Sequence, residues 1–257
     1  MHPLTLLTFR VRQLVAALLI AGTLASSAQA ASITWGAPQG ISSDSDVDTK
    51  GSLVGALSFG PVGGAPSTTV NGVFFNGLAM NGNPVSSGHF ALSGAGAVGF
   101  ISSNPPFSTL SPQYQSLLST FTGGVGAPLI LTISGLLIGQ SYEFEWWSNI
   151  SSSFDPGVTT ATAGNSVTLL SWPTFQNGGV GQFAIGTFVA DSSNEIITFT
   201  SPTINNAERN KVLNGFQLRQ IPTVADSGRT IILLSAALLT LHLARRAGHA
   251  RRSKSCS

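Results

Sequence analysis

The sequence predicts an all-β protein: a single β-sandwich with one short helix, preceded by a signal peptide and followed by a transmembrane helix. Short runs of β-branched and aromatic residues are separated by clusters of Gly, Asn, Ser and Pro between the two chain ends. Strand patterns do not alternate with helical patterns, so a parallel sheet built from βαβ units is not expected. The roughly 190 residues between the ends are enough to bury the core of one β domain.

Eight segments have the length and composition of strands, and turn-forming residues bound each of them. The candidate strands are 52–59, 68–75, 129–133, 142–147, 167–170, 182–189, 196–200 and 212–219.

One helix is predicted among these strands. Ser111 is a suitable N-cap, Pro112 is a suitable first helical residue, and the Gly123-Gly124 pair would end the helix. Its apolar face would consist of Tyr114, Leu117, Leu118 and Phe121.

The strand predicted at 142–147 follows a glycine-containing turn. Because side chains alternate along a strand, Tyr142, Phe144 and Trp146 share one face, and we expect that face in the core. Leu136 lies six residues before Tyr142, a spacing that resembles the tyrosine corner of β-sandwiches. In that corner the tyrosine hydroxyl hydrogen-bonds back to the backbone.

The opposite face of the same strand would carry Glu143, Glu145 and Trp147. Residues two apart on a strand have Cα atoms roughly 6.5–7 Å apart, which is similar to the separation of glycosidase carboxylates. Trp147 could stack on a sugar ring, so these three residues are candidate glycan contacts. The same stripe is also typical of the plain exposed face of a sheet, and that is the favoured interpretation.

Residues 1–30 have the three parts of a secretory signal peptide. Two arginines form the charged region, residues 14–24 form the apolar region, and residues 28–30 form an A-x-A cleavage site. We therefore expect the mature chain to begin at Ala31.

The net charge of +2 belongs to the two ends of the chain. Between Ala31 and Gln220 the sequence has four basic and nine acidic residues, a net charge of −5, so nucleic-acid binding is not expected. The single cysteine, Cys256, lies outside this part, and the body must be stabilised by its core without disulfides.

The C-terminal part of the chain divides into a linker at 220–229, an apolar run at 230–244 and a basic segment at 245–257. An apolar helix closed by Arg245 and Arg246 is held with its basic end in the cytoplasm, so we expect a membrane anchor.

The apolar run is short for a membrane span. Its fifteen residues between Arg229 and Arg245 would form about 22 Å of helix, against a hydrocarbon core of about 30 Å. The long side chains of the two arginines can reach the interfaces, and the bilayer can thin. A core helix of a soluble domain is the alternative.

A short motif, Val224-Ala225-Asp226-Ser227-Gly228, precedes the apolar run and its arginine-rich end. This order resembles the C-terminal sorting signals of PEP-CTERM proteins, most closely the VPDSG-CTERM variety. Four of the five letters match, and Ala225 stands where that variety has proline. The resemblance implies processing by an exosortase, a membrane cysteine protease that cuts near the motif.

The body, residues 31–219, resembles the jelly-roll, galactose-binding-like domains of exported proteins with such tails. The resemblance is carried by segments 44–47, 135–142, 181–188 and 214–219. It implies a jelly-roll-like sandwich that binds glycans or serves as a passive surface module.

Asp44, Asp46 and Asp48 alternate in the sequence, as the first oxygen ligands of a calcium loop do. The Gly and the distant Glu of an EF-hand do not follow, so a solvated turn is favoured and calcium is a weak alternative. His89 is the only histidine of the body, and no G-x-S-x-G motif occurs, so a histidine-based metal centre or a serine hydrolase is not expected.

Three functional hypotheses follow, in decreasing order of support. The first is an exported, non-catalytic cell-surface or matrix protein, anchored in the inner membrane by its C-terminus and then placed at the surface or outside. The second is a carbohydrate-binding module for extracellular polysaccharide. The third is a hydrolase of such a polysaccharide.

Overall fold

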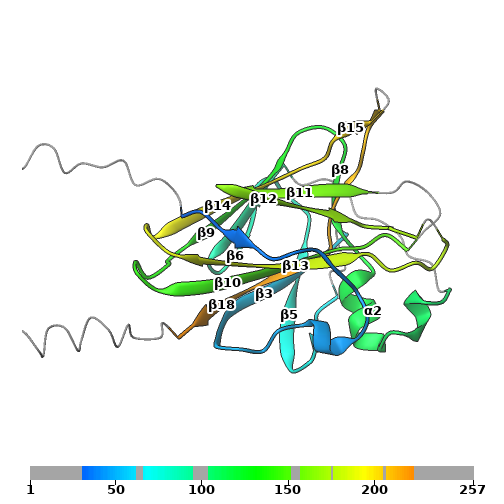
Figure 1. The fold of residues 1–257 in the computed structure, drawn as a ribbon, viewed down its shortest axis with the longest axis horizontal. Coiled ribbons are helices and arrows are strands. Elements are labelled where there is room, and N and C mark those ends of the chain that lie inside the picture. The colour runs from blue at the N-terminus through cyan, green and yellow to red at the C-terminus, as the bar shows by residue number, and fades with distance from the viewer. Residues whose placement is uncertain are drawn as a thin grey trace, which may run out of the picture. The chain divides into compact units, whose positions relative to one another are not determined.

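The computed structural model describes residues 31–61, 66–94, 104–151, 157–174, 176–204 and 207–222. The chain divides between Ile221 and Pro222 into two compact units, and all described strands and helices belong to the first. That unit is built from two main β-sheets packed on each other, with one α-helix beside them (Figure 1). The prediction of an all-β sandwich is confirmed.

The larger sheet has eight strands, and all of its pairings are antiparallel except the parallel pair β3–β5. Its order is β1 (Thr34–Trp35), β13 (Gln182–Val189), β10 (Ser141–Ser148), β18 (Gly215–Ile221), β3 (Ser52–Gly60), β5 (Val73–Ala79) and β4 (Thr68–Val70), with β2 (Gln39–Gly40) also on β13.

The smaller main sheet has six antiparallel strands. Its order is β12 (Asn165–Leu170), β11 (Val158–Ala163), β14 (Asn194–Thr200), β9 (Leu129–Ser134), β7 (Phe90–Ser93) and β6 (Val85–Ser87). Two further strand pairs are β17 (Lys211–Leu213) with β8 (Thr122–Gly124) and β15 (Thr203–Ile204) with β16 (Ala207–Glu208).

Two of the predicted strands are each divided in two. The segment 68–75 is the hairpin β4–β5, because Asn71 and Gly72 both adopt positive φ and form its turn. The segment 212–219 changes pairing partner at Asn214, so β17 and β18 belong to different sheets. Strand β11 was not predicted, because its Thr-Ala sequence carries a weak apolar signal, yet it lies between β12 and β14.

The predicted helix is α2 (Pro112–Leu118), and 3₁₀ turns lie at Asp44–Asp46 and Phe107–Thr109. Ser111 caps it as expected, since its Oγ accepts a hydrogen bond from the Tyr114 backbone N–H. The helix ends earlier than predicted, and the Gly123-Gly124 pair belongs to β8.

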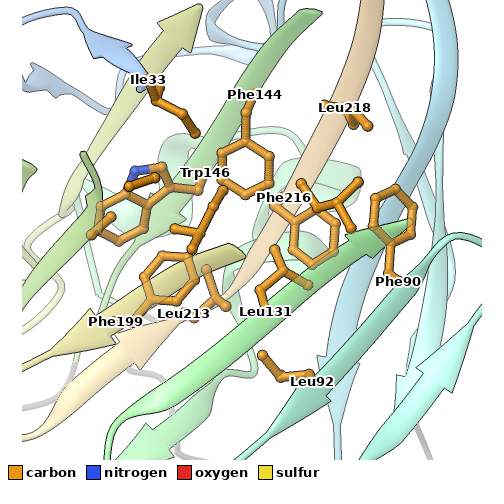
Figure 2. Packing of buried hydrophobic residues seen from close by; sticks show 14 of the residues in the cluster. Ile33, Phe90, Leu92, Leu131, Phe144, Trp146, Phe199, Leu213, Phe216 and Leu218 are labelled. Atoms are coloured by element: carbon orange, nitrogen blue, oxygen red, sulfur yellow. The ribbon is translucent and has the colours of Figure 1, made fainter. Parts of the chain in front are cut away.

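The space between the two main sheets holds the main hydrophobic core, to which β10 contributes Tyr142, Phe144 and Trp146 as predicted. Figure 2 shows aromatic rings from different strands meeting there. Phe144 stacks on Phe216 with ring centroids 5.3 Å apart, and Trp146 meets Phe199 edge to face at 5.2 Å.

The tyrosine corner is confirmed. The backbone N–H of Leu137 donates a hydrogen bond to the Tyr142 hydroxyl at 2.9 Å. The Tyr142 ring is buried and stacks on Phe188. The turn before β10 is thereby fixed to the strand that follows it.

A second hydrophobic cluster covers the outer face of the large sheet and corrects the prediction that this face is exposed. Trp147 is 0% exposed and contacts Phe75 edge to face at 5.5 Å. Helix α2, the β4–β5 hairpin and the segment 41–47 contribute to this cluster, so the chain itself covers the face. The cluster consists of Ile41, Val47, Ala56, Val70, Val73, Phe75, Phe107, Leu110, Tyr114, Leu117, Leu118, Trp147 and Phe183.

The predicted signal peptide (1–30), sorting motif (224–228), transmembrane helix (230–244) and basic segment (245–257) lie outside the described residues. Within the part of the chain that the structure describes, no helix has the length and apolarity needed to cross a bilayer.

Candidate functional site

Three charged residues of the body, Glu143, Glu145 and Arg219, lie together on the outer face of the large sheet, beneath the segment 41–51. Glu145 lies opposite Gln217 and Glu143 opposite Arg219 in the register of β10 and β18. Directly paired side chains on adjacent strands share a face, so these four side chains form one polar cluster. Below, "the covering segment" means residues 41–51.

Glu145 is fully buried and binds both its neighbour in the sheet and the covering segment. Its Oε2 accepts hydrogen bonds from Gln217 Nε2 at 2.5 Å and from the Asp48 backbone N–H at 3.1 Å. Its Oε1 is buried without a hydrogen-bond partner. Burial raises the pKa of Glu145 to about 8, so the carboxyl is mostly protonated at neutral pH.

Arg219 holds the covering segment through backbone carbonyls. Its Nε donates to Lys50 O at 2.5 Å, and one terminal nitrogen donates to Thr49 O at 2.9 Å and Gly51 O at 3.1 Å. The other terminal nitrogen donates to Gln217 Oε1 at 3.1 Å. The planar guanidinium group presents its donors in a fixed fork, which suits three carbonyls of one tight turn.

Gly51 makes this close approach possible. Its φ is +68°, and a Cβ at this position would lie 2.3 Å from the Gln220 carbonyl oxygen. A residue with a side chain would therefore push the covering segment away from the sheet.

Glu143 lies next to this network and is also buried, and its Oε1 has no hydrogen-bond partner. Burial raises the pKa of Glu143, and Asp48 adds to the rise, whereas Lys50 and Arg219 act against it. The two glutamates thus share one face, as predicted, but that face is enclosed.

The three candidate glycan contacts, Glu143, Glu145 and Trp147, are all buried in this fold. Glu145 and Trp147 are both 0% exposed, so a sugar ring cannot stack on Trp147 in this fold. Trp147 Nε1 instead donates a hydrogen bond to the Tyr114 hydroxyl at 3.0 Å. The alternation of the strand was correct, but the covering segment and α2 could not be foreseen from it.

The three candidate calcium ligands turn toward different partners. Asp44 Oδ1 accepts from Ser111 Oγ at 2.6 Å, whereas Asp46 Oδ2 accepts from the Ser42 backbone N–H at 2.6 Å. Asp48 forms a salt bridge with Lys50 at 3.0 Å. Among the described residues, no three His, Cys, Asp or Glu side chains are grouped so that they could hold a metal ion.

An open hollow of about 340 Å³ lies beside the covering segment. Polar side chains of β2, of the covering segment and of the β4–β5 turn surround it, and Phe183 and Ile185 of β13 provide its apolar part. Its lining consists of Gln39, Ser45, Asp46, Val47, Asp48, Thr49, Lys50, Asn71, Phe183 and Ile185.

A second polar cluster, at Asn149 and Asn214, was not foreseen. Asn214 Nδ2 donates to the carbonyls of Leu118 and Thr120 at 2.9 Å each, and Asn214 Oδ1 accepts from the Asn149 N–H at 2.6 Å. Asn149 begins an N-x-S sequon but is buried, so in this fold it is a structural residue. Gln217 and Arg219 were missed as well, although their position on the strand paired with β10 could have suggested them.

Comparisons of this chain with protein-family models, with curated proteins and with solved structures found no match.

Proposed function

We propose that this chain is an exported, non-catalytic cell-surface or matrix protein whose body is a jelly-roll-like sandwich. The order of segments in the sequence carries the proposal: a signal peptide, a weakly charged β body, a VPDSG-like motif, an apolar run and an arginine-rich end. Each segment matches one step of export, folding outside the cytoplasm and retention at the membrane.

The chemistry of the body supports a non-catalytic role. The two carboxylates best suited to catalysis, Glu143 and Glu145, are buried beneath the covering segment. Glu145 is hydrogen-bonded to Gln217 and to the Asp48 backbone, so its carboxyl group is engaged in contacts within the fold. These contacts give the acidic residues of β10 a structural role that does not require a catalytic reaction.

The tail is proposed to be a sorting signal read by an exosortase-like protease. The motif differs from the usual sequence only at Ala225. In a reporter with an export signal and residues 220–257, Asp226→Ala and Gly228→Leu should block removal of the tail and leave membrane insertion intact, because an apolar helix inserts without the motif. A full-length band should accumulate in the membrane fraction.

Thr223→Ala, one residue before the motif, is the matched control and should be processed like the parent. If the motif variants and the parent lose the tail at the same rate, residues 230–244 are a plain anchor. Deletion of residues 229–257 should release the body into the surrounding fluid. A truncated protein that stays in the membrane fraction would contradict the anchor itself.

Carbohydrate binding is a second candidate, and the polar hollow beside the covering segment favours it. Gln39, Lys50 and Asn71 offer hydrogen-bond donors around an apolar patch, which is a typical arrangement for a sugar site. A glycan array probed with the mature chain, with and without chelator, tests this candidate. Lys50→Ala should reduce binding at the hollow. An array on which no glycan binds the protein would exclude this candidate.

A further inference from the structure

Glu195 is a buried carboxylate far from the cluster described above. It is the second residue of β14, and its side chain is only 1% exposed. The carboxylate accepts hydrogen bonds from the backbone N–H groups of Ile196, at 3.2 Å, and of Ala31. None of the cationic side chains that the structure describes forms a salt bridge with Glu195.

A carboxylate in this position is costly in its charged form. Burial raises the pKa of Glu195 to about 7, and the nearby Asp191 adds to the rise, although the two backbone N–H groups act against it. Asp191 is the only charged side chain of the described residues whose field acts noticeably on Glu195. Among the residues that the structure describes, none therefore supplies a cation to this carboxylate.

The backbone nitrogen of Ala31 is held firmly at this carboxylate. Ala31 is itself buried, and Ile33 lies in the main core. The Ile33 N–H donates to Ala163 O at 2.9 Å, and Thr34 and Trp35 pair with β13. Both sheets thus fix the chain from Ala31 onward.

Ala31 is also the residue at which the mature chain is expected to begin. In the precursor its nitrogen is an amide with one N–H. Hydrolysis of the Ala30–Ala31 peptide bond adds one water, leaves a carboxylate on Ala30 and gives Ala31 an α-amino group. At neutral pH that group is largely protonated, so it carries a positive charge and three N–H donors.

We propose that Glu195 is the binding site for the α-ammonium group of Ala31, so that removal of residues 1–30 creates a buried ion pair in the folded body. This inference rests on the proposed function, because it requires cleavage after Ala30. A buried carboxylate without a cation destabilises the precursor, whereas the paired carboxylate stabilises the mature protein. Processing thereby favours folding after export rather than before it.

The pH dependence of the two forms should differ. In the precursor form, the pKa of Glu195 is raised above its unfolded value, so stability falls as pH rises through about 7. In the mature form, the ammonium lowers the pKa of Glu195 and the carboxylate raises the pKa of the amine. The advantage of the mature form is therefore largest near neutral pH and declines on both sides.

Four proteins test the pair in detergent. The first protein is residues 31–257 beginning at Ala31, and the second is the same chain with a Gly-Ser dipeptide before Ala31. The third and fourth are these two chains with Glu195→Gln, which keeps the size of the side chain and a hydrogen-bond acceptor but removes the charge. At pH 7 the chain that starts at Ala31 should have an unfolding constant about tenfold lower than its extended form, equivalent to one pKa unit.

This difference should disappear in the Glu195→Gln pair. An equal effect of the dipeptide in both backgrounds, or no effect with Glu195, would overturn the ion pair. NMR titration of the Ala31 amine gives a second readout: its pKa should lie above the ordinary value of about 7.7–8.0 and return toward it in Glu195→Gln.

N-terminal sequencing of the exported protein separates this inference from the proposed function. An exported chain that begins at another residue overturns the maturation step, whatever the four proteins show. An exported chain that begins at Ala31 but shows no coupling to Glu195 overturns the ion pair and leaves the proposal of export intact.

Discussion

The inner face of β10 packs against the six-stranded sheet, whereas helix α2, the covering segment and the hairpin β4–β5 of its own sheet cover its outer face. The inner residues Tyr142, Phe144 and Trp146 belong to the main core. On the outer face, Trp147 packs against the hairpin β4–β5 and contacts Tyr114 of α2, while Glu145 binds Gln217 and the covering segment. One strand is therefore buried on both sides, by apolar packing on one and by mixed polar and apolar contacts on the other.

This difference shows that the alternation of residues along a strand identifies its two faces, but not whether each face is exposed or buried. An antiparallel strand with charged residues on one face is usually exposed there. In this protein both carboxyl groups are buried, and hydrogen bonds from Gln217 and from the Asp48 backbone N–H offset part of the cost of burying Glu145. The outer face is thus as important for stability as the inner one, and four predictions test that statement.

The largest effects are expected for the two adjacent tryptophans. Trp146→Ala and Trp147→Ala should each lower the free energy of unfolding by about 3–5 kcal/mol, because each leaves a large cavity in a packed cluster. Urea unfolding followed by circular dichroism measures both. A loss below about 1 kcal/mol for Trp147→Ala would mean that the outer face is exposed, as the sequence predicted.

Arg219→Met should lower the free energy of unfolding by about 2–4 kcal/mol, because the covering segment loses the donors to its carbonyls. Methionine keeps the length of the side chain but cannot donate. Hydrogen exchange should show faster opening of residues 49–51 in the variant. Lys50→Ala is the matched control: that side chain is 80% exposed, and its loss should leave exchange nearly unchanged.

The sequence predicted the inner face better than the outer one for a physical reason. Tyr142, Phe144 and Trp146 are apolar at a period of two, and in a sandwich such a stripe packs into the core between the two sheets. The burial of Glu145 depends on contacts with residues 97 and 72 positions away, Asp48 and Gln217, and no local pattern encodes them.

The same contrast applies to the rest of the chain. The cap at Ser111 and the corner at Tyr142 involve partners within a few residues, and both were predicted. The cluster of Asn149 and Asn214 joins positions 65 residues apart, and it was not. For the candidate site, residue types and shared faces could be read from the sequence, whereas enclosure could not.

A smaller effect is expected from the protonation of Glu145. Its pKa is raised to about 8 in the fold, so the native state binds a proton more tightly than the unfolded state. The stability that this group contributes is present at low pH and is lost as pH rises through about 8. Glu145→Gln should therefore raise the free energy of unfolding at pH 9 by about 1–2.5 kcal/mol relative to the parent.

At pH 5 the same variant should match the parent or be slightly less stable, since the parent carboxyl is then neutral as well. Urea unfolding between pH 5 and pH 9 gives the profile. A constant difference between the two proteins over this range would mean that Glu145 does not titrate in the fold.

The smallest effect concerns a pair of tyrosines, one from each side of the large sheet. Tyr142→Phe should lower the free energy of unfolding by about 0.5–1.5 kcal/mol, because it removes one hydrogen bond and keeps the stacked ring. The donor, the N–H of Leu137, belongs to a residue that is 59% exposed, so water can replace the lost hydroxyl. Tyr114→Phe should cost more, because it leaves the Nε1–H of the fully buried Trp147 without its acceptor. Urea unfolding of both variants ranks them, and a larger loss at Tyr142 than at Tyr114 would show that the outer face is the more tolerant of the two.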